Sequence, residues 1–192
     1  MDMTYGHKRL KSLESYFDVV GGEIRMLRKF ESETINTATK NFSIDNTFAG
    51  YTFGCSLHKG RLENGQGIFI TKFHSNFPWL KCKNDVSLLL KLKHENLLQL
   101  LGYSIEGRYV SLVYDFAVYE TLLAFIFDPK YTFLDWSMRN KIILVVATVL
   151  AYLHQHDVVH GNVNPGKILL DECLHPKLSL EITLDEVTFR NW

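Results

Sequence analysis

The sequence HGNVNPGKILLDE, from His160 to Glu172, is the most informative stretch of this chain. Its first half is mostly polar, and the apolar run Ile168–Leu170 follows soon after Pro165. A longer apolar segment, Ile142 to Leu153, comes shortly before it and has about a dozen residues, whereas a membrane-spanning helix needs roughly 20. We therefore expect that segment to be a buried core helix and expect no membrane span.

The composition indicates a globular protein of 192 residues, of which 46% are hydrophobic and 13% aromatic. That is enough apolar material for one large domain or two small lobes. The 21 basic and 21 acidic residues cancel, so nothing global favours nucleic acid or an anionic membrane as a partner. The three cysteines form no C-x-x-C pair, and no signal-peptide pattern or Gly after Met1 is visible. These features predict a cytoplasmic protein.

Strand signals follow an N-terminal extension, residues 1–29, that need not be ordered. An Asn-Gly turn at Asn64 separates two strand-like runs, around Thr52–His58 and Gly67–Phe73, and predicts an antiparallel hairpin. Tyr109–Phe116 is rich in β-branched and aromatic residues and predicts a further strand.

Helix signals surround these strands. Ser32 is a candidate N-cap for a short helix with Ile35 and Ala38 on one face, and Trp79–Lys93 has helical periodicity.

Two later helices are predicted over Thr121–Phe127 and Ser137–His154, the second capped by Asp135 or Ser137. The order of elements predicts a small α+β lobe followed by a helical one.

Several segments, in the right order over about residues 30 to 182, resemble the protein kinase domain of plant receptor-like kinases. They are FESETINTATKNF from Phe30, NDVSLLLKLKHENLLQLLGY from Asn84, WSMRNKIILVVATVLAYLH from Trp136, and VVHGN. The resemblance implies a protein-kinase-like α+β fold, with a complete small N-lobe over residues 30–116. It implies an incomplete helical C-lobe over residues 117–192, which stops after the position of the family's D-F-G motif.

The resemblance also implies an ATP site, in altered form. The three glycine positions of the phosphate loop fall on Ala49, Tyr51 and Gly54, and a tyrosine should obstruct the approach of the backbone to phosphates. Lys72 matches the strand lysine that contacts phosphates, and its helix partner falls on Asp85, one methylene shorter than glutamate. A solvated lysine at a strand end is the open alternative for Lys72. We expect ATP binding to be weak or absent.

The resemblance places the family's catalytic aspartate on Asn162, which offers no anionic acceptor for a proton. Loss of a positioned general base typically costs about 10²- to 10⁴-fold in rate. Gly161 and Asn164 replace an arginine and a lysine, while the two Mg²⁺-binding positions fall on Lys167 and Leu180, which cannot ligate a metal. The sequence therefore predicts no catalytic residue, no metal and no enzymatic activity.

Two further expectations concern the long helix and its surroundings. The histidines His154, His156 and His160 lack a Cys or carboxylate at metal-ligand spacing, which argues against a zinc site among them. The chain stops at Trp192, short of the helices that would cover the long helix in a complete domain of this type. An exposed apolar patch is therefore expected on the long helix. Its candidate members are Ile142, Ile143, Val146 and Val149.

Among plant receptor-like kinases the sequence looks most like the ZRK-type pseudokinases. That resemblance implies an inactive adaptor or decoy in plant immune signalling, which docks onto an NLR receptor and recruits or mimics another kinase. The expected partners are proteins, in the cytoplasm or at the plasma membrane through those partners. Two alternatives stay open: a residual ATP-binding protein or unorthodox serine/threonine kinase, and a truncated fragment without a selected function.

Overall fold

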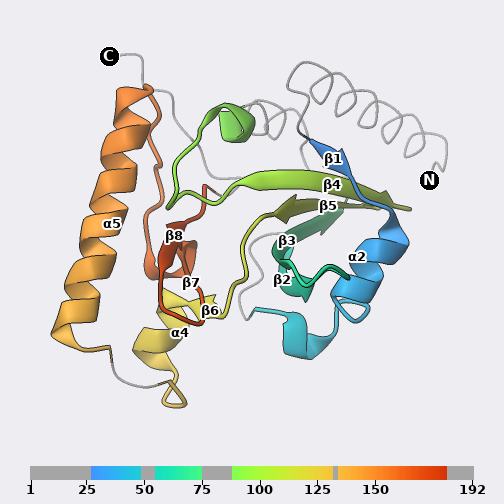
Figure 1. Ribbon diagram of the computed structural model, residues 1–192, viewed down its shortest axis with the longest axis horizontal. Helices are drawn as coiled ribbons and strands as arrows, with labels where there is room; N and C mark the ends of the chain where they lie inside the picture. Colours follow the sequence, from blue (N-terminus) through green and yellow to red (C-terminus); the bar gives the residue numbers. More distant parts are fainter. Residues whose placement is uncertain (1–26, 49–54, 75–87, 132–133, 181–192) are drawn as a thin grey trace. The chain divides into compact units, whose positions relative to one another are not determined.

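The computed structural model describes residues 27–48, 55–74, 88–131 and 134–180 (Figure 1). The chain divides into two compact units. The first comprises Met1–Leu90 and Gln99–Ala117, and the second comprises Lys91–Leu98 and Val118–Trp192. The first contains a sheet and a short helix, and the second has two helices and a small sheet, so the predicted α+β class is confirmed.

A five-stranded sheet forms the first unit, in the order β1-β4-β5-β3-β2. Its strands are β1 (Arg28–Lys29), β2 (Cys55–Arg61), β3 (Gly67–His74), β4 (Leu100–Glu106) and β5 (Tyr109–Tyr114). The short strand β1 pairs in parallel with β4, and the other neighbours are antiparallel. Gly102 permits the β1 pairing, because a Cβ there would collide with the carbonyl oxygen of Arg28.

The β2–β3 hairpin is the one that the Asn-Gly turn predicted. Gly65 has φ of +85°, a conformation that glycine adopts without strain. The Leu62 amide donates to the Gln66 carbonyl at 2.9 Å, and the Asn64 side chain accepts from the Gln66 amide at 3.0 Å. The predicted start of the first strand, Thr52, lies outside the described residues, as does most of the helix expected over Trp79–Lys93, of which residues 88–91 are described as helical.

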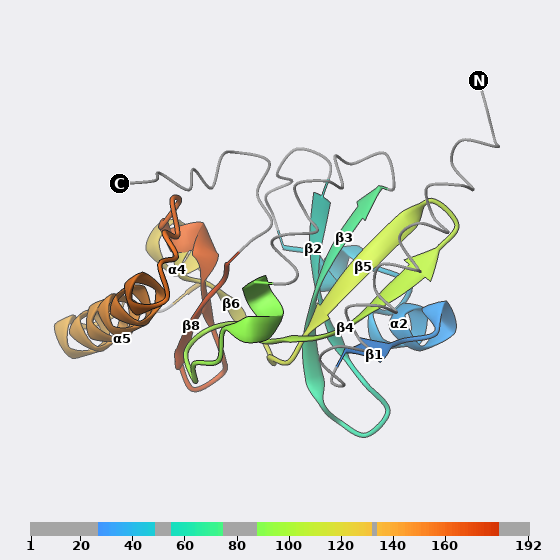
Figure 2. The same ribbon diagram turned by 90° about the horizontal axis from the view of Figure 1, so that it is seen from above.

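Helix α2 (Ser32–Ala38) packs on one face of this sheet (Figure 2). It buries Ile35 and Ala38, as the periodicity predicted, against Ile68 and Ile70 of β3. Burying one such aliphatic side chain contributes about 1.5 to 3 kcal/mol. The predicted cap is wrong by one residue: the N-cap is Glu31, which has extended backbone angles and makes no capping bond with its side chain.

The second unit is built on helices α4 (Leu122–Phe127) and α5 (Trp136–Gln155) and a three-stranded sheet. The strands are β6 (Glu120–Thr121), β7 (Ile168–Leu170) and β8 (Pro176–Leu178), in that order. Thr121 caps α4 by accepting from the amide of Ala124 at 3.2 Å. Asp135 caps α5 by accepting from the amide of Met138 at 2.7 Å, which decides between the two predicted caps.

Helix α5 is buried along one stripe and exposed elsewhere. Ile142, Val149 and Leu153 are buried, since their spacing of seven and four residues puts them on one face. Ile143 is 60% and Leu144 is 67% exposed. The prediction of a buried core helix is therefore correct for this stripe only.

The predicted apolar patch on α5 is correct only in part. Ile143 is exposed and Val146 is half-buried, but Ile142 and Val149 belong to the buried stripe. The helix is longer than the apolar segment suggested, and by length and composition it is the one described helix that could cross a membrane. Core helices of soluble proteins meet the same criterion.

Candidate functional site

The loop before β7 is anchored by His160. The His160 side chain is buried, and its Nε2 donates to the carbonyl of Ser179 at 3.0 Å, while Nδ1 accepts from the Asn162 amide at 3.3 Å. These two bonds require the proton on Nε2. Burial lowers the pKa of His160 below its ordinary value, although the bond to Ser179 opposes the shift. The neutral His160 side chain therefore links the loop to the segment after β8 through hydrogen bonds.

Two asparagines complete the loop's hydrogen bonding. The Asn164 Nδ2 donates to the Asn162 Oδ1 at 2.9 Å, and the Asn164 Oδ1 accepts from the Gly166 amide at 2.9 Å. The second bond caps the 3₁₀ turn Pro165–Lys167. Gly161 has φ of +77°, which favours glycine at the start of the loop. The amide oxygen at the expected base position thus accepts a hydrogen bond within the loop.

The two predicted metal-ligand positions carry no oxygen donor in their side chains. Lys167 is buried, its backbone carbonyl accepts from the Ser179 amide at 2.9 Å, and its charge contributes to the lowered pKa of His160. Leu180 is half-buried. A lysine ammonium can attract a phosphate by charge, but it cannot replace a carboxylate or amide oxygen in a Mg²⁺ shell.

Lys72 lies against two aromatic side chains in the first unit, Phe42 and Tyr109, which we name the aromatic box. Its Nζ is 3.6 Å from the centroid of the Phe42 ring and 4.8 Å from that of Tyr109. Its ion-pair partner is Glu106, with Nζ 3.9 Å from Oε2. Desolvation lowers the pKa of Lys72, and the charge of Glu106 opposes this. Lys72 is thus held by structural contacts and is not a solvated lysine.

The pairing of Lys72 with Asp85 stays a prediction. Asp85 and Gly54 lie outside the described residues, as do Ala49 and Tyr51 of the loop expected over phosphates.

Because side chains alternate along a strand, Lys72 and its neighbours in sequence on β3 point to opposite faces of the sheet. Lys72 shares a face with Ile68 and Ile70, beneath α2, whereas Phe69 and Thr71 point to the other face. On that other face, the Phe69 ring lies between Phe48, at 5.8 Å between centroids, and Tyr114, at 6.0 Å. Thr71 Oγ1 is buried and has no hydrogen-bond partner within the described ranges. The period-2 pattern could have shown which face Lys72 occupies.

His58 adjoins the same box and was missed by sequence reasoning. Its Nδ1 is 3.0 Å from Thr47 Oγ1 and its Nε2 is 2.7 Å from Ser56 Oγ. Its ring meets the edge of Phe42 at 4.9 Å between centroids. Burial and then the charge of Lys72 lower the pKa of His58 to about 4, so the ring is neutral at neutral pH.

Comparison with known proteins shows which family this chain resembles in sequence. A family model described as protein tyrosine and serine/threonine kinase matches residues 70–183. The G-type lectin S-receptor-like serine/threonine-protein kinase SD1-29 of Arabidopsis thaliana is 40% identical over 156 residues, which is 78% of this chain and 19% of that protein. The cysteine-rich receptor-like protein kinase 26 of the same plant is 40% identical over 157 residues, covering 79% and 24% respectively. The chain therefore spans about a fifth to a quarter of these relatives.

These matches correct one prediction. The expectation that the chain is not an enzyme is contradicted, because the matched family model describes kinases. A third relative, the G-type lectin S-receptor-like serine/threonine-protein kinase At1g61490, is 37% identical over 168 residues. The relationship points to an enzyme.

Proposed function

The chain belongs to the protein tyrosine and serine/threonine kinase family, with relatives among plant receptor-like kinases, and from this premise we propose that it acts as an adaptor that docks onto other signalling proteins. The observation that carries the proposal is the loop from His160 to Lys167. Its hydrogen bonds join groups of the loop to one another and to Ser179, so polar side chains of the loop are paired within the chain. The resemblance to ZRK-type proteins adds the kind of partner, an NLR immune receptor or a second kinase.

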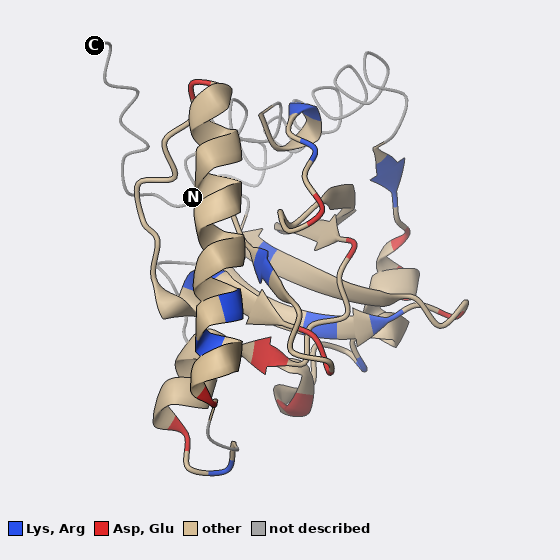
Figure 3. Ribbon diagram, turned by 60° about the vertical axis from the view of Figure 1, so that its left-hand side comes forward, with Lys and Arg blue, Asp and Glu red and all other residues tan. Residues whose placement is uncertain are grey.

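Exposed apolar side chains give such a partner a surface to bind. On α5, Trp136, Ile143 and Leu144 are 72%, 60% and 67% exposed and lie on one side of the helix; we name them the α5 patch. The charged residues of α5 are Arg139 and Lys141, so the colours of the helix ribbon in Figure 3 mark charge only in the part nearer its N-terminal end. Exposed apolar clusters of this kind mark protein interaction surfaces.

Co-purification from plant cytoplasm tests the docking function. The variant Leu144→Glu puts a charge into the α5 patch and should abolish capture of an NLR receptor or a kinase, while leaving the fold intact because the side chain is exposed. The matched control Gln155→Glu adds the same charge on the same helix, about 17 Å along its axis from Leu144, and should capture normally. Equal capture by both variants would remove the α5 patch from the proposal.

A second candidate is an unorthodox serine/threonine kinase that holds nucleotide phosphates with lysines. The buried Lys167 favours it, because a cation in the loop can neutralise phosphate charge without metal. A thermal-shift titration with ATP, with and without Mg²⁺, tests it together with a radiolabelled phosphotransfer assay. A shift that is independent of Mg²⁺ and lost in Lys167→Met supports this candidate. No shift at millimolar ATP rejects it and leaves ATP binding weak or absent.

A further inference from the structure

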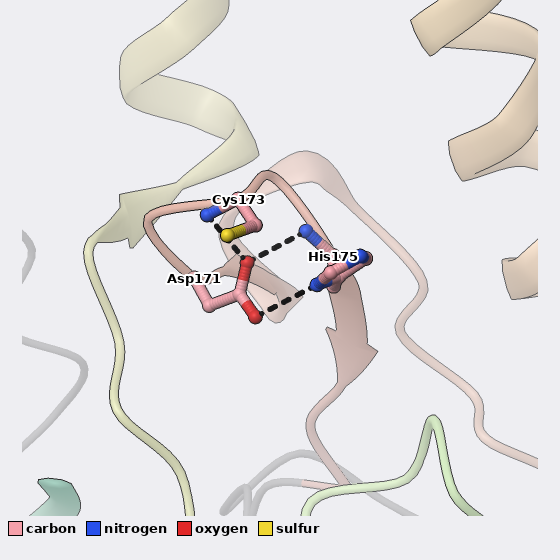
Figure 4. Close-up of side chains that lie close together, drawn as sticks. All are labelled: Asp171, Cys173 and His175. Carbon is pink, nitrogen blue, oxygen red and sulfur yellow. Dashed lines mark hydrogen bonds and ion pairs between the residues drawn. The ribbon is translucent and has the colours of Figure 1, made fainter.

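The turn between β7 and β8 brings together three side chains that bind metals. The strands pair Leu170 with Pro176, so residues 171–175 form the connection. Asp171, Cys173 and His175 alternate along it, and one ligand atom of each lies within 4.8 Å of the other two. Figure 4 shows the carboxylate, the sulfur and the imidazole on the same side of the turn.

The turn holds the carboxylate of Asp171 in a fixed orientation. Its Oδ1 accepts from the amides of Cys173, at 2.9 Å, and His175, at 2.8 Å. Leu174 has φ of +60°, which folds the chain back at this point. The second oxygen, Oδ2, is within hydrogen-bonding distance of the Nδ1 of His175, at 3.1 Å, and an ion bound by both atoms would replace this contact. The side chains of Asp171 and His175 are 27% and 59% exposed, so an ion can reach them from solvent.

The donor set matches one class of metal. Zinc takes Cys sulfur, His nitrogen and carboxylate oxygen at bond lengths that put tetrahedral donors about 3.3 to 3.6 Å apart. The separation of Nδ1 and Oδ2 is already 3.1 Å, and the exposed Cys173 can bring its sulfur closer by rotating its side chain. Calcium and magnesium prefer oxygen ligands, so a thiol and an imidazole disfavour them.

We propose that Asp171, Cys173 and His175 form a Zn²⁺ site with three protein ligands and a fourth position open to water. Oδ2 and Nδ1 bind the ion through lone pairs, with the imidazole proton on Nε2. Cys173 binds as a thiolate, and its proton is released to solvent. The two amides on Oδ1 orient the carboxylate from behind, as partners of zinc ligands commonly do. The site uses none of the residues assigned to phosphate chemistry.

Calorimetric titration of Zn²⁺ into the full chain, without a histidine tag and with reduced thiols, tests the proposal. We expect one Zn²⁺ per chain. Cys173→Ser and His175→Ala should each weaken binding by about tenfold or more, because even partners behind a zinc ligand contribute 10- to 100-fold. With Co²⁺ as a spectroscopic probe, the thiolate-to-metal absorption band should vanish in Cys173→Ser.

Three further variants separate the site from other sources of zinc binding. Asp171→Asn keeps an oxygen for the two amides but removes the charged donor, so it should weaken binding without changing the unfolding temperature. His154→Ala and Cys82→Ser remove a histidine and a cysteine outside the turn and should bind as the parent chain does. Undiminished binding in a Cys173→Ser/His175→Ala double variant, or a stoichiometry well below one, would overturn the proposal.

Discussion

Lys72 and the loop from His160 to Lys167 are the two regions that the kinase resemblance links to phosphate chemistry, and they are built differently. In the loop, neutral groups satisfy one another through directed hydrogen bonds, from His160 to Ser179 and from Asn164 to Asn162. Around Lys72, a charge is held by two ring faces and one carboxylate. Hydrogen bonds depend on the position of single atoms, whereas cation–π contacts and ion pairs tolerate movement and respond to salt.

This difference in bonding predicts how much stability each region should lose on mutation. Removing the His160 side chain leaves the Ser179 carbonyl, its partner in a buried hydrogen bond, unsatisfied at a cost of about 1 to 3 kcal/mol, whereas the bond between the Asn162 and Asn164 side chains is exposed. Replacing a charge in the aromatic box by an apolar group of similar shape keeps most of the packing. A mutation of His160 should therefore reduce stability more than a mutation of Lys72.

His160→Ala should give the largest effect. It opens a cavity and leaves the Ser179 carbonyl without its donor, so we expect the free energy of unfolding to fall by about 2 to 4 kcal/mol. Urea denaturation measures it. His154→Ala, at an exposed position of the same unit, is the control and should change the free energy by less than about 0.5 kcal/mol. Similar losses in both variants would show that the loop has no special rigidity.

Acidification tests the box and the loop together. The pKa of His58 is about 4 in the folded chain, below the ordinary histidine value of 6.5, so the unfolded chain binds the proton first as the pH falls. Stability is then full above about pH 6.5 and is lost as the pH falls towards 4, by at most about 3 kcal/mol and less with solvent screening. His160, whose pKa is also lowered, acts in the same direction.

Urea midpoints between pH 7 and pH 4 measure this loss. In His58→Gln, which keeps polar atoms near Thr47 and Ser56, the dependence should become shallower, and the remainder belongs to His160. An unchanged slope would mean that His58 is accessible to protons in the folded chain.

The sequence predicted well what local chemistry determines. The Asn64–Gly65 turn, the Asp135 cap and the inward face of α2 follow from residues close together in the chain. The contact of Lys72 with Glu106 could not be found in this way, because Glu106 is 34 positions further along and comes near Lys72 through the pairing of β3 with β5 and of β5 with β4. Sequence patterns specify faces and turns, while pairs across a sheet depend on its strand order.

The exposed side of α5 could be predicted only in part, for a related reason. An exposed apolar patch was expected on this helix, but apolar residues surround most of it, so the sequence does not tell which of them face outward. Only packing selects the stripe of Ile142, Val149 and Leu153 and leaves Ile143 exposed. The prediction that the chain is not an enzyme failed for a different reason. It rested on the chemistry of single residues in the loop from His160 to Lys167, whereas the family relationship points to an enzyme.

Lys72→Met tests the aromatic box directly. Methionine has a similar length and packs well against rings, so we expect the free energy of unfolding to fall by no more than about 1 kcal/mol. Lys59→Met, which removes a lysine 5.7 Å from the centroid of the Phe48 ring, is the matched control on the neighbouring strand. A loss above about 2 kcal/mol from Lys72→Met, with none from Lys59→Met, would show that the box depends on its charge as strictly as the loop depends on its hydrogen bonds.

Asn162→Asp should have the smallest effect on stability. Aspartate has the same shape and can still accept the bond from Asn164 Nδ2, so we expect a change within about 0.5 kcal/mol by urea denaturation. The new charge supplies the anionic acceptor that the loop lacks, while Lys167 and Leu180 still offer magnesium no oxygen. Phosphotransfer measured on this variant and on the parent chain then tests whether the residue at position 162 limits the rate. A gain of tenfold or more would identify the acceptor as limiting, and an unchanged rate would assign the limit to the metal positions.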